Sequence, residues 1–452
     1  MIVIIALLTT PLNFTNKATG YVRDMSSETL FERRERLLGA GAPLFYREPV
    51  HIVRGEGAWL YDADGRRYLD MYNNVPCVGH AHPHVVEAMH HQAATLNVHS
   101  RYLHEGILDY AERLMGLHAE PLSSVVFTCT GTEASEVAML MARAATGGRG
   151  IISTDASYHG NSAEVRKLSA SRWPAEDPAF RAIAFPQTYR PLQEGVHGTA
   201  LTELYLAEVE AAIDGFERDN VPFAGMFVCS ILANEGLPDI PPGFMPRAAE
   251  LVRKAGGLFI ADEVQSGFCR TGRWWGYEVM GFVPDIVTMG KPMGNGLPLA
   301  AVAANKNLVD TFRREARYFN TFASSPLQAA VGMAVLDVIE NEDLRSSVAE
   351  VGGYLKGALR GLEAVWEPIG DVRGHGLFIG LEWVSDRASK APDREGAIDV
   401  VNRLKDKGFL ISNAGAFGNV LKIRPPLVFN KEQAELFLTA FDETLHERYG
   451  RT

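Results

Sequence analysis

The sequence predicts an α/β protein built on a mostly parallel β-sheet whose faces are covered by helices. Short apolar runs alternate with helical patterns through residues 125–302, which is typical of strands joined by crossover helices. Polar or glycine-rich residues follow directly after several of these runs, as they do where parallel strands end at a ligand site. A chain of 452 residues exceeds a simple single core, so we expect about two or three domains, or one large domain with a lobed partner.

The first predicted elements precede and open this block. Residues 61–65, Tyr-Asp-Ala-Asp-Gly, form a turn between two strand-like runs, which predicts an N-terminal hairpin. The run Val125-Val126-Phe127 predicts a buried strand, and the apolar positions after residue 132 follow a helical period. Strand, glycine turn and helix therefore follow one another here.

The same pattern recurs along the chain. Further parallel strands are predicted at residues 151–152, 226–228, 258–261 and 286–289. Residues 326–339 predict a long helix that leads into a C-terminal lobe. We therefore expect an N-terminal segment (1–70) that contributes to a small domain, a large domain (71–329) and a C-terminal small domain (330–452).

Composition excludes several classes of partner. Forty-four Lys and Arg against 55 Asp and Glu leave a net charge of −11, which disfavours nucleic acid and acidic membrane surfaces. No stretch approaches the roughly 18 apolar residues of a membrane span, and the apolar residues 1–8 lack the basic leader of a signal peptide. Four scattered cysteines without a CxxC pair favour a reducing cytoplasm and no disulfide scaffold.

Two charged residues stand where neighbouring strands are predicted to end. Asp262 closes the run 258–261, and Lys291 follows the run 286–289 after one glycine. A lysine at the end of a buried strand loses hydration, which lowers its pKa and leaves an amine that can form an imine. A carboxylate opposite it can keep a pyridine nitrogen protonated. The pair predicts a pyridoxal 5′-phosphate (PLP) site, although singly such residues are more often a solvated loop lysine and a helix cap.

A phosphate cradle is predicted nearby. Thr130, Gly131 and Thr132 lie between a strand and a helix, where free backbone N–H groups and the helix dipole favour an anion. Tyr158 and His159 follow the strand at 151–152 and offer an aromatic face for a planar ring. A plain turn and a packed loop tyrosine are the structural alternatives. No GxGxxG follows the strand, so a dinucleotide is not indicated.

Five histidines between residues 80 and 91 predict no metal site. The His80-x-His82-x-His84 alternation runs through a proline and has no carboxylate or cysteine at ligand spacing.

Nine ordered motifs resemble the class III (omega-type) aminotransferases, which are PLP enzymes of fold type I. They are Gly79-His-Ala-His-Pro83, Thr130-Gly-Thr-Glu-Ala-Ser-Glu136, Tyr158-His-Gly160, Ile260-Ala-Asp-Glu-Val-Gln-Ser-Gly-Phe268, Arg270-Thr-Gly272, Thr288-Met-Gly-Lys291, Asn320-Thr-Phe322, Arg373-Gly-His-Gly376 and Arg424-Pro-Pro-Leu427. The resemblance implies a large domain with a mostly parallel sheet, plus a smaller α+β domain formed from both termini.

The resemblance also implies roles for single residues. Lys291 would hold PLP as a Schiff base and carry protons, and Asp262 would pair with the pyridinium nitrogen. The cofactor-binding residues would be Gly131, Thr132, Tyr158, His159, Asp262, Gln265, Lys291 and Thr321. Gln265 would approach the ring hydroxyl. Because Thr321 would reach the phosphate of the neighbouring subunit's cofactor, a homodimer or a tetramer is implied.

Substrate recognition is expected from Glu235 and Arg424. In the family such a glutamate pairs with an arginine, masking it for amines and freeing it for carboxylates, which arginine binds with two parallel hydrogen bonds. A purely structural ion pair is the alternative. The chain departs from the family at Ser230 and Ile231, where a glutamate and a proline are usual. This departure leaves the substrate side of the pocket open.

Transamination by a ping-pong mechanism, between an amine or amino acid and a keto acid or aldehyde, is the expected activity. Residues 72–80, 97–104, 283–295 and 341–344 are similar to the phospholyase branch of the family. Elimination of phosphate and ammonia from a phosphorylated amino alcohol is therefore an alternative. An isomerase or racemase with the same cofactor, and a non-catalytic binding protein, are further alternatives; an intact Lys291 and Asp262 disfavour the last.

Overall fold

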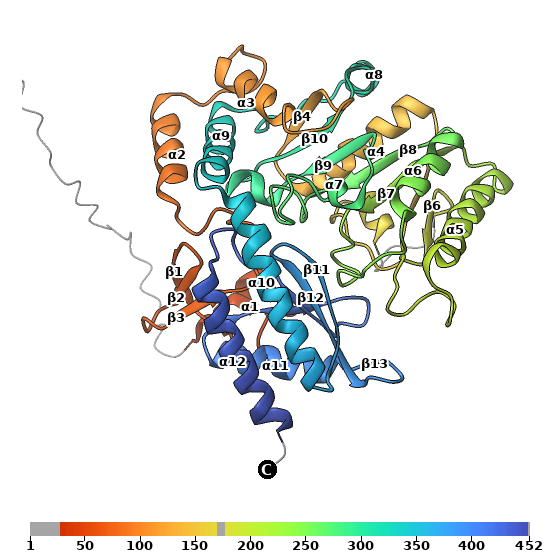
Figure 1. The fold of residues 1–452 in the computed structure, drawn as a ribbon. Coiled ribbons are helices and arrows are strands. Elements are labelled where there is room, and N and C mark those ends of the chain that lie inside the picture. Colours follow the sequence, from red (N-terminus) through yellow and green to blue (C-terminus); the bar gives the residue numbers. More distant parts are fainter. Residues whose placement is uncertain (1–27, 170–176, 451–452) are drawn as a thin grey trace, which may run out of the picture. The chain divides into compact units, whose positions relative to one another are not determined.

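The computed structural model describes residues 28–169 and 177–450 of the chain (Figure 1). Internal contacts divide the chain into two units, residues 1–49 and 50–452. The apolar stretch at residues 1–8 lies outside the described residues.

The second unit is built around a seven-stranded sheet in the order β4-β10-β9-β8-β7-β5-β6. Its strands are β4 (Ser124–Thr128), β5 (Gly150–Thr154), β6 (Phe180–Ile183), β7 (Phe223–Cys229), β8 (Leu258–Asp262), β9 (Ile286–Met289) and β10 (Ala300–Ala304). Strand pairs are parallel except at β10, which is antiparallel to both β4 and β9. The predicted mostly parallel sheet is confirmed.

Five of these strands are the predicted ones, namely β4, β5, β7, β8 and β9. β6 and β10 were not predicted. β10 reads Ala-Ala-Val-Ala-Ala and is buried along its length, although alanine is depleted in strands. Helix α4 (Gly131–Thr146) packs on this strand, so small side chains suit the position.

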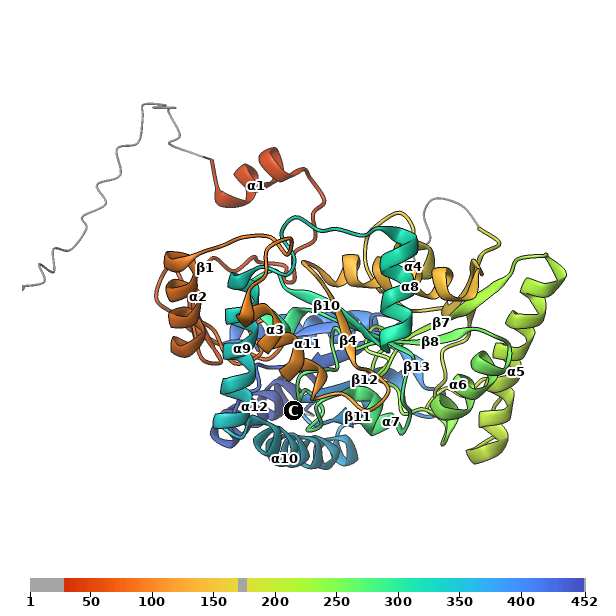
Figure 2. The same cartoon turned by 90° about the horizontal axis from the view of Figure 1, so that it is seen from above.

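Helices accompany the strands along the chain. They are α1 (Leu30–Leu38), α2 (Pro83–Thr95), α3 (Glu105–Met115), α4 (Gly131–Thr146), α5 (Gly198–Arg218), α6 (Phe244–Lys254), α7 (Gly276–Met280), α8 (Lys306–Ala316), α9 (Pro326–Asn341), α10 (Leu344–Val365), α11 (Arg394–Asp406) and α12 (Lys431–Tyr449), with two 3-10 turns, η1 (Val165–Leu168) and η2 (Lys291–Gly294). The predicted long helix is α9, which starts at Pro326 after the cap residue Ser325. It lies beside α2 in both views (Figures 1 and 2).

The core of the large sheet forms against α4. This helix buries Val137, Ala138 and Met141 at helical spacing. They join a cluster with strand residues such as Phe227 and Ile260. Because this face is packed on the sheet, the N-terminus of α4 is held at the carboxyl end of β4, next to the ends of the other parallel strands.

Two smaller sheets complete the second unit. The first holds β1 (Ile52–Glu56), β2 (Trp59–Asp62), β3 (Arg67–Asp70) and β14 (Phe409–Leu410). The second holds β11 (Ile369–His375), β12 (Phe378–Asp386), β16 (Val420–Ile423) and β15 (Ser412–Ala414) in this order, with β13 (Ala391–Pro392) beside β12. β2 and β3 pair antiparallel, so the predicted hairpin is confirmed.

Segments distant in sequence meet in the first small sheet, where β14 pairs in parallel with β3. The division into 1–70, 71–329 and 330–452 stays a prediction. Among the described residues, the helices are all too short or too polar to cross a membrane.

Candidate active site

A cavity of about 160 Å³ lies at the carboxyl ends of the parallel strands. It is lined by Thr130, Gly131, Thr132, Tyr158, His159, Gly160, Asp262, Val264, Gln265 and Lys291. These residues end or follow β4, β5, β8 and β9. The structure therefore brings together every predicted cofactor residue except Thr321.

Lys291 starts η2, directly after β9 and Gly290. Its backbone φ of 31° lies in the left-handed region, which is strained for a residue with a side chain. Burial lowers the pKa of its amine; the charge of Asp262 opposes this effect and that of Arg424 adds to it. A lower pKa favours the uncharged amine, which is the form that attacks an aldehyde.

Asp262 ends β8 and is oriented by two contacts. Its Oδ2 lies 2.7 Å from Nδ1 of His159, and its Oδ1 accepts a hydrogen bond from the Val264 N–H at 2.9 Å. Both Asp262 and His159 are buried. The cavity thus contains one fixed carboxylate with a histidine behind it, an arrangement that can hold a protonated ring nitrogen.

The start of α4 forms the predicted anion cradle. The Thr130 hydroxyl accepts a hydrogen bond from the Glu133 N–H at 3.1 Å, and the Glu133 carboxylate accepts one from the Thr130 N–H at 3.1 Å. This capping box fixes the first turn. The N–H groups of Gly131 and Thr132 have no preceding helical carbonyl, so they are suited to bind a phosphate.

The segment after β5 closes one side of the cavity. Gly160 has a φ of 144°, and a Cβ there would lie 2.7 Å from Oγ1 of Thr132, so only glycine fits at this close approach. The Tyr158 ring is accessible, with 43% of the residue exposed. Its accessible aromatic face can stack on a planar ring.

Thr321 does not line the cavity. It is exposed, in the bend before α9, and Phe322 beside it is 76% exposed. Within one chain, Thr321 is therefore apart from the other predicted cofactor residues.

Glu235 and Arg424 are not paired with each other in the described part of the chain. The Glu235 carboxylate accepts a hydrogen bond from the Thr154 hydroxyl at 2.5 Å, while its Oε2 is buried without a hydrogen-bond partner there. Burial raises the pKa of Glu235. Arg424 instead donates from Nε to the Tyr72 carbonyl at 2.9 Å and from Nη1 to Oε1 of Gln265.

These contacts form a chain of amides that crosses the cavity wall. Arg424 donates to Oε1 of Gln265, whose Nε2 donates to Oδ1 of Asn234 at 3.2 Å. The Asn234 amide then donates to the Tyr158 carbonyl at 3.1 Å. Gln265 therefore connects the expected substrate side of the cavity to the aromatic side.

Lys422 is the residue near this site that the sequence analysis did not select. It lies on β16, is 3% exposed, and has a pKa well below the usual range, because of burial and the nearby charge of Arg424. Glu235 opposes this shift, so that carboxylate lies near the Lys422 amine. A lysine inside the apolar run Val-Leu-Lys-Ile was the available signal.

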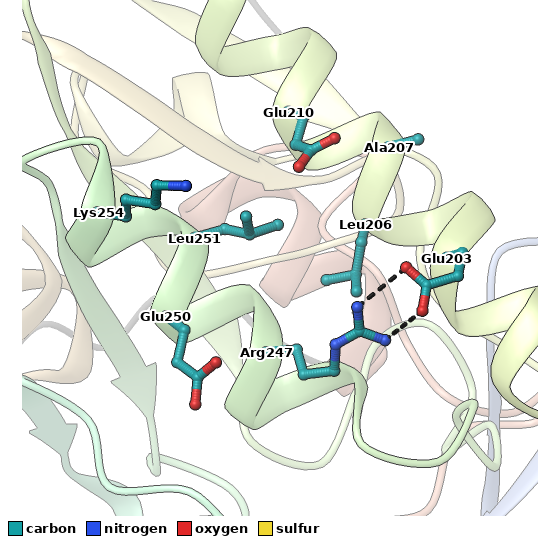
Figure 3. Close-up of a pocket in the computed structure, with 8 residues that line it drawn as sticks. All are labelled: Glu203, Leu206, Ala207, Glu210, Arg247, Glu250, Leu251 and Lys254. Atoms are coloured by element: carbon teal, nitrogen blue, oxygen red, sulfur yellow. Dashed lines mark hydrogen bonds and ion pairs between the residues drawn. The ribbon is translucent and has the colours of Figure 1, made fainter.

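A second hollow, of about 290 Å³, lies between α5 and α6, and its side chains do not suggest a catalytic site (Figure 3). Glu203 pairs there with Arg247 through two contacts of 2.5 and 2.9 Å. The remaining side chains are aliphatic or are charges of both signs on helix surfaces, which is typical of a solvated helix pair. We therefore place the chemistry in the strand-end cavity.

The histidines around the start of α2 have separate partners. His80, His82 and His84 contact three different carboxylates, on Asp70, Glu342 and Asp337 respectively. In these contacts each imidazole is engaged with its own acid.

Comparisons with known proteins agree with this geometry. The sequence matches the family Aminotransferase class-III over residues 45–445. The chain belongs to the class III aminotransferase family. An Arabidopsis thaliana relative named alanine–glyoxylate aminotransferase 2 homolog 2, mitochondrial, is 39% identical over 427 residues, 93% of this chain and 88% of that protein.

The phospholyase resemblance is also confirmed. A Caenorhabditis elegans relative named ethanolamine-phosphate phospho-lyase homolog 1 is 35% identical and covers 95% of both chains. A solved phospholyase from Arthrobacter, in complex with phosphoethanolamine, is 39% identical with a TM-score of 0.89 over 92% of this chain and 99% of that one. The predicted fold type I architecture is therefore confirmed.

Family membership identifies this class III aminotransferase as a PLP-dependent enzyme, a transaminase. The cavity fits that cofactor, because PLP has an aldehyde, a basic ring nitrogen and a phosphate. Lys291, Asp262 and the start of α4 offer a suitable group for each of the three.

Proposed function

We propose that this enzyme transfers an amino group from an amine or amino acid to a keto acid or aldehyde, with Lys291 as its catalytic residue. The position of the Lys291 amine carries the proposal. The amine lies in the cavity wall with Asp262, and burial lowers its pKa. The cofactor supplies an aldehyde that condenses with amines and a ring that accepts electron density.

Lys291 has two tasks in this proposal. It would hold the cofactor by its aldehyde carbon, and a substrate amine would take its place there. The freed Lys291 amine would then accept a proton from the substrate carbon and act as the acid that returns one. The order would be ping-pong, because the amino group would stay in the enzyme after the first product leaves.

The other predicted residues position the cofactor. Asp262 would keep the ring nitrogen protonated, and His159 orients Asp262 through the 2.7 Å contact. Gly131 and Thr132 would bind the phosphate with their N–H groups. Tyr158 would stack on the ring, and Gln265 would approach the ring hydroxyl from its place between Arg424 and Asn234.

A homodimer is part of the proposal. Thr321 would bind the cofactor phosphate of the partner subunit, which fits its exposure outside its own cavity. Two large apolar side chains are also exposed: Leu103 completely and Phe322, next to Thr321, to 76%. Exposed apolar groups of this size can contact another chain.

A direct test is the half-reaction with an amine donor and no acceptor. The holoenzyme should lose the absorbance of its Lys291-bound cofactor and release pyridoxamine phosphate after denaturation. Borohydride reduction followed by peptide mapping should place the cofactor on Lys291, and Lys291→Ala should abolish both results. Absence of a half-reaction across amines and amino acids would contradict transamination.

Phosphate elimination is the second candidate, and the similarity to the Arthrobacter phospholyase favours it. On this hypothesis the same cavity removes phosphate and ammonia from a phosphorylated amino alcohol such as phosphoethanolamine. Release of inorganic phosphate without any acceptor would support it. If no phosphorylated amine released inorganic phosphate, this candidate would be excluded.

We retain the cytoplasm as the proposed compartment. The four cysteines are free thiols, which fits a reducing environment. Two relatives carry the word mitochondrial in their names. Fractionation of cells that express the full chain would decide between the two compartments.

A further inference from the structure

The residue that carries the reactive amine has a backbone conformation that its own sequence disfavours. Lys291 precedes Pro292, and a residue before a proline favours an extended conformation. The φ of Lys291 is nevertheless 31°, in the left-handed region that residues with a side chain rarely adopt. Such a conformation persists only where the surrounding structure holds it. The contacts that hold Lys291 should therefore lie around η2.

The turn η2 ends at a second residue in the left-handed region. This residue is Asn295, with a φ of 45°, and asparagine tolerates that conformation better than most residues. The Asn295 N–H donates to the Pro292 carbonyl at 3.1 Å. The backbone bond closes the turn behind Lys291 and leaves the Asn295 carboxamide to reach another part of the chain.

Three hydrogen bonds tie this turn to a segment far earlier in the sequence. Oδ1 of Asn295 accepts the N–H of Val78 at 3.0 Å, and Nδ2 of Asn295 donates to the Gly79 carbonyl at 2.9 Å. The Cys77 thiol donates to the Pro292 carbonyl at 3.2 Å. The carboxamide thus pairs with backbone through both of its polar atoms, and the thiol holds the turn at the residue next to Lys291.

The Cys77–Gly79 segment has its own anchors. The Leu427 N–H donates to the Cys77 carbonyl at 2.6 Å. Just beyond the segment, His80 and Gly57 exchange two backbone hydrogen bonds, of 2.8 and 3.1 Å. The first two residues of the segment are buried. Because its position is set by other parts of the chain, the segment can serve as a fixed support for η2.

We propose that Asn295 and the Cys77–Gly79 segment position Lys291, by holding its backbone in the left-handed conformation that keeps its amine in the cavity wall with Asp262. Asn295 and Cys77 lie outside the residues that line the cavity, so they act through Lys291 and not on a ligand. A displacement of about 1 Å in a reacting group can slow a reaction about 100-fold. This inference deepens the proposed function and rests on it.

The test uses the variant Asn295→Gly. Glycine adopts a positive φ without strain, so the variant removes both side-chain hydrogen bonds and permits the same backbone. Asn220→Gly is the matched control, because Asn220 is exposed in the turn after α5 and has a φ of 54°. The chemical change is the same in both variants, so any effect of glycine on the flexibility of a turn is shared.

The first measurement is the attachment of PLP to the apoenzyme, in which the Lys291 nitrogen replaces the aldehyde oxygen of PLP and water leaves. Borohydride stops the reaction at successive times, and peptide mapping gives the fraction attached to Lys291. At saturating PLP, attachment should be about 10–100-fold slower in Asn295→Gly than in the parent enzyme or Asn220→Gly. Asn295→Asp, which keeps an acceptor for the Val78 N–H, should recover part of the rate. Cys77→Ala, which removes one weak donor, should slow attachment by less than Asn295→Gly does.

The second measurement is the half-reaction of the holoenzyme with an amine donor, with rates counted per attached cofactor. The maximal rate should fall about 10–100-fold in Asn295→Gly, while the half-saturating donor concentration changes by less than about 2-fold. A purely structural role for Asn295 would lower the number of loaded sites and leave both constants at the parent values.

Parent-like rates of attachment and half-reaction in Asn295→Gly, or equal slowing in Asn220→Gly, would overturn the inference. A weaker donor affinity with an unchanged maximal rate would assign Asn295 to substrate binding and would also overturn it. If no donor gives a half-reaction in the parent enzyme, but attachment to Lys291 is slower in Asn295→Gly, the proposed transamination fails and the positioning role stands.

Discussion

The strand-end cavity and the neighbouring face of β16 differ in how their buried charges are compensated. In the cavity, Asp262 is satisfied by His159 and by a backbone N–H. Lys422 on β16 and Arg424 just after it have no carboxylate partner in the described part of the chain. A region that keeps one resident cofactor can complete its interactions from the protein. A region that binds and releases a charged substrate can leave a protein charge that the substrate neutralises.

The largest effect should come from a substitution in the strand-end cavity, where Asp262 has its hydrogen-bond partners. Asp262→Asn keeps the shape of the side chain but removes the charge that holds a ring proton. Both half-reactions should slow by about 10²–10³-fold for every donor, as measured by stopped-flow absorbance. His159→Asn, which only loosens Asp262, should cost less. If Asp262→Asn slowed only anionic donors, the two regions would not be separable as described.

A buried acid without a cation sharpens the comparison. Glu263 is fully buried beside Asp262 and accepts hydrogen bonds from Ser266 Oγ at 2.7 Å and from the N–H groups of Gly276 and Tyr277 at 2.9 and 2.8 Å. Burial nevertheless raises its pKa from 4.5 to about 7. Neutral Glu263 therefore adds stability that is present below pH 4.5 and is lost as pH rises through about 7, about 3 kcal/mol in all.

Glu263→Gln stays uncharged at every pH. The variant should show a smaller difference in melting temperature between pH 5 and pH 8 than the parent enzyme does. An unchanged difference would mean that the donors around Glu263 already compensate its charge.

The next effect concerns the phosphate side of the cavity. In Gly160→Ala the new Cβ would meet the Thr132 hydroxyl at 2.7 Å with an unfavourable φ, so PLP affinity of the apoenzyme should fall by about 10–100-fold. Gly147→Ala is the matched control at the other end of α4, where φ is also positive but the space is open. It should lower stability without changing PLP affinity in an absorbance titration.

The smallest effect should come from a substitution near Lys422 and Arg424. Glu235→Gln removes the negative charge near Lys422, so an anionic substrate no longer competes with it. Apparent affinity for phosphoethanolamine should rise about 5-fold, and affinity for amines without an anion should not. Steady-state KM values for the two substrate types would measure this. A fall for phosphoethanolamine would assign Glu235 a direct role in binding it.

The sequence was sufficient to predict the strand-end cavity, because the residues of that cavity follow their strands directly. Asp262 and Lys291 each stand at the end of an apolar run, and parallel strands bring such ends to one edge. Gly131 is likewise next to its strand. Adjacency in sequence therefore predicted proximity in space, although the roles of these residues remain proposals.

The position of β16 was harder to predict from the sequence, because it depends on long-range strand pairing. β16 is placed by its antiparallel neighbours β12 and β15, and periodicity does not show which loop such a strand will face. The expected Glu235–Arg424 pair rested on resemblance, whereas the fold directs Lys422 toward Glu235. β10 escaped notice for another reason, since an alanine-rich strand has no local β preference.

The amide chain from Arg424 to Tyr158 has a fixed polarity. A guanidinium has only donors, so Gln265 must turn its oxygen to Arg424 and its NH₂ to Asn234, which in turn must give its own NH₂ to the Tyr158 carbonyl. The Tyr158 carbonyl, which only accepts, imposes the same orientation from the other end of the chain. Replacing Arg424 by leucine would leave the Gln265 oxygen without its donor, whereas the Tyr158 carbonyl would still hold the Asn234 amide.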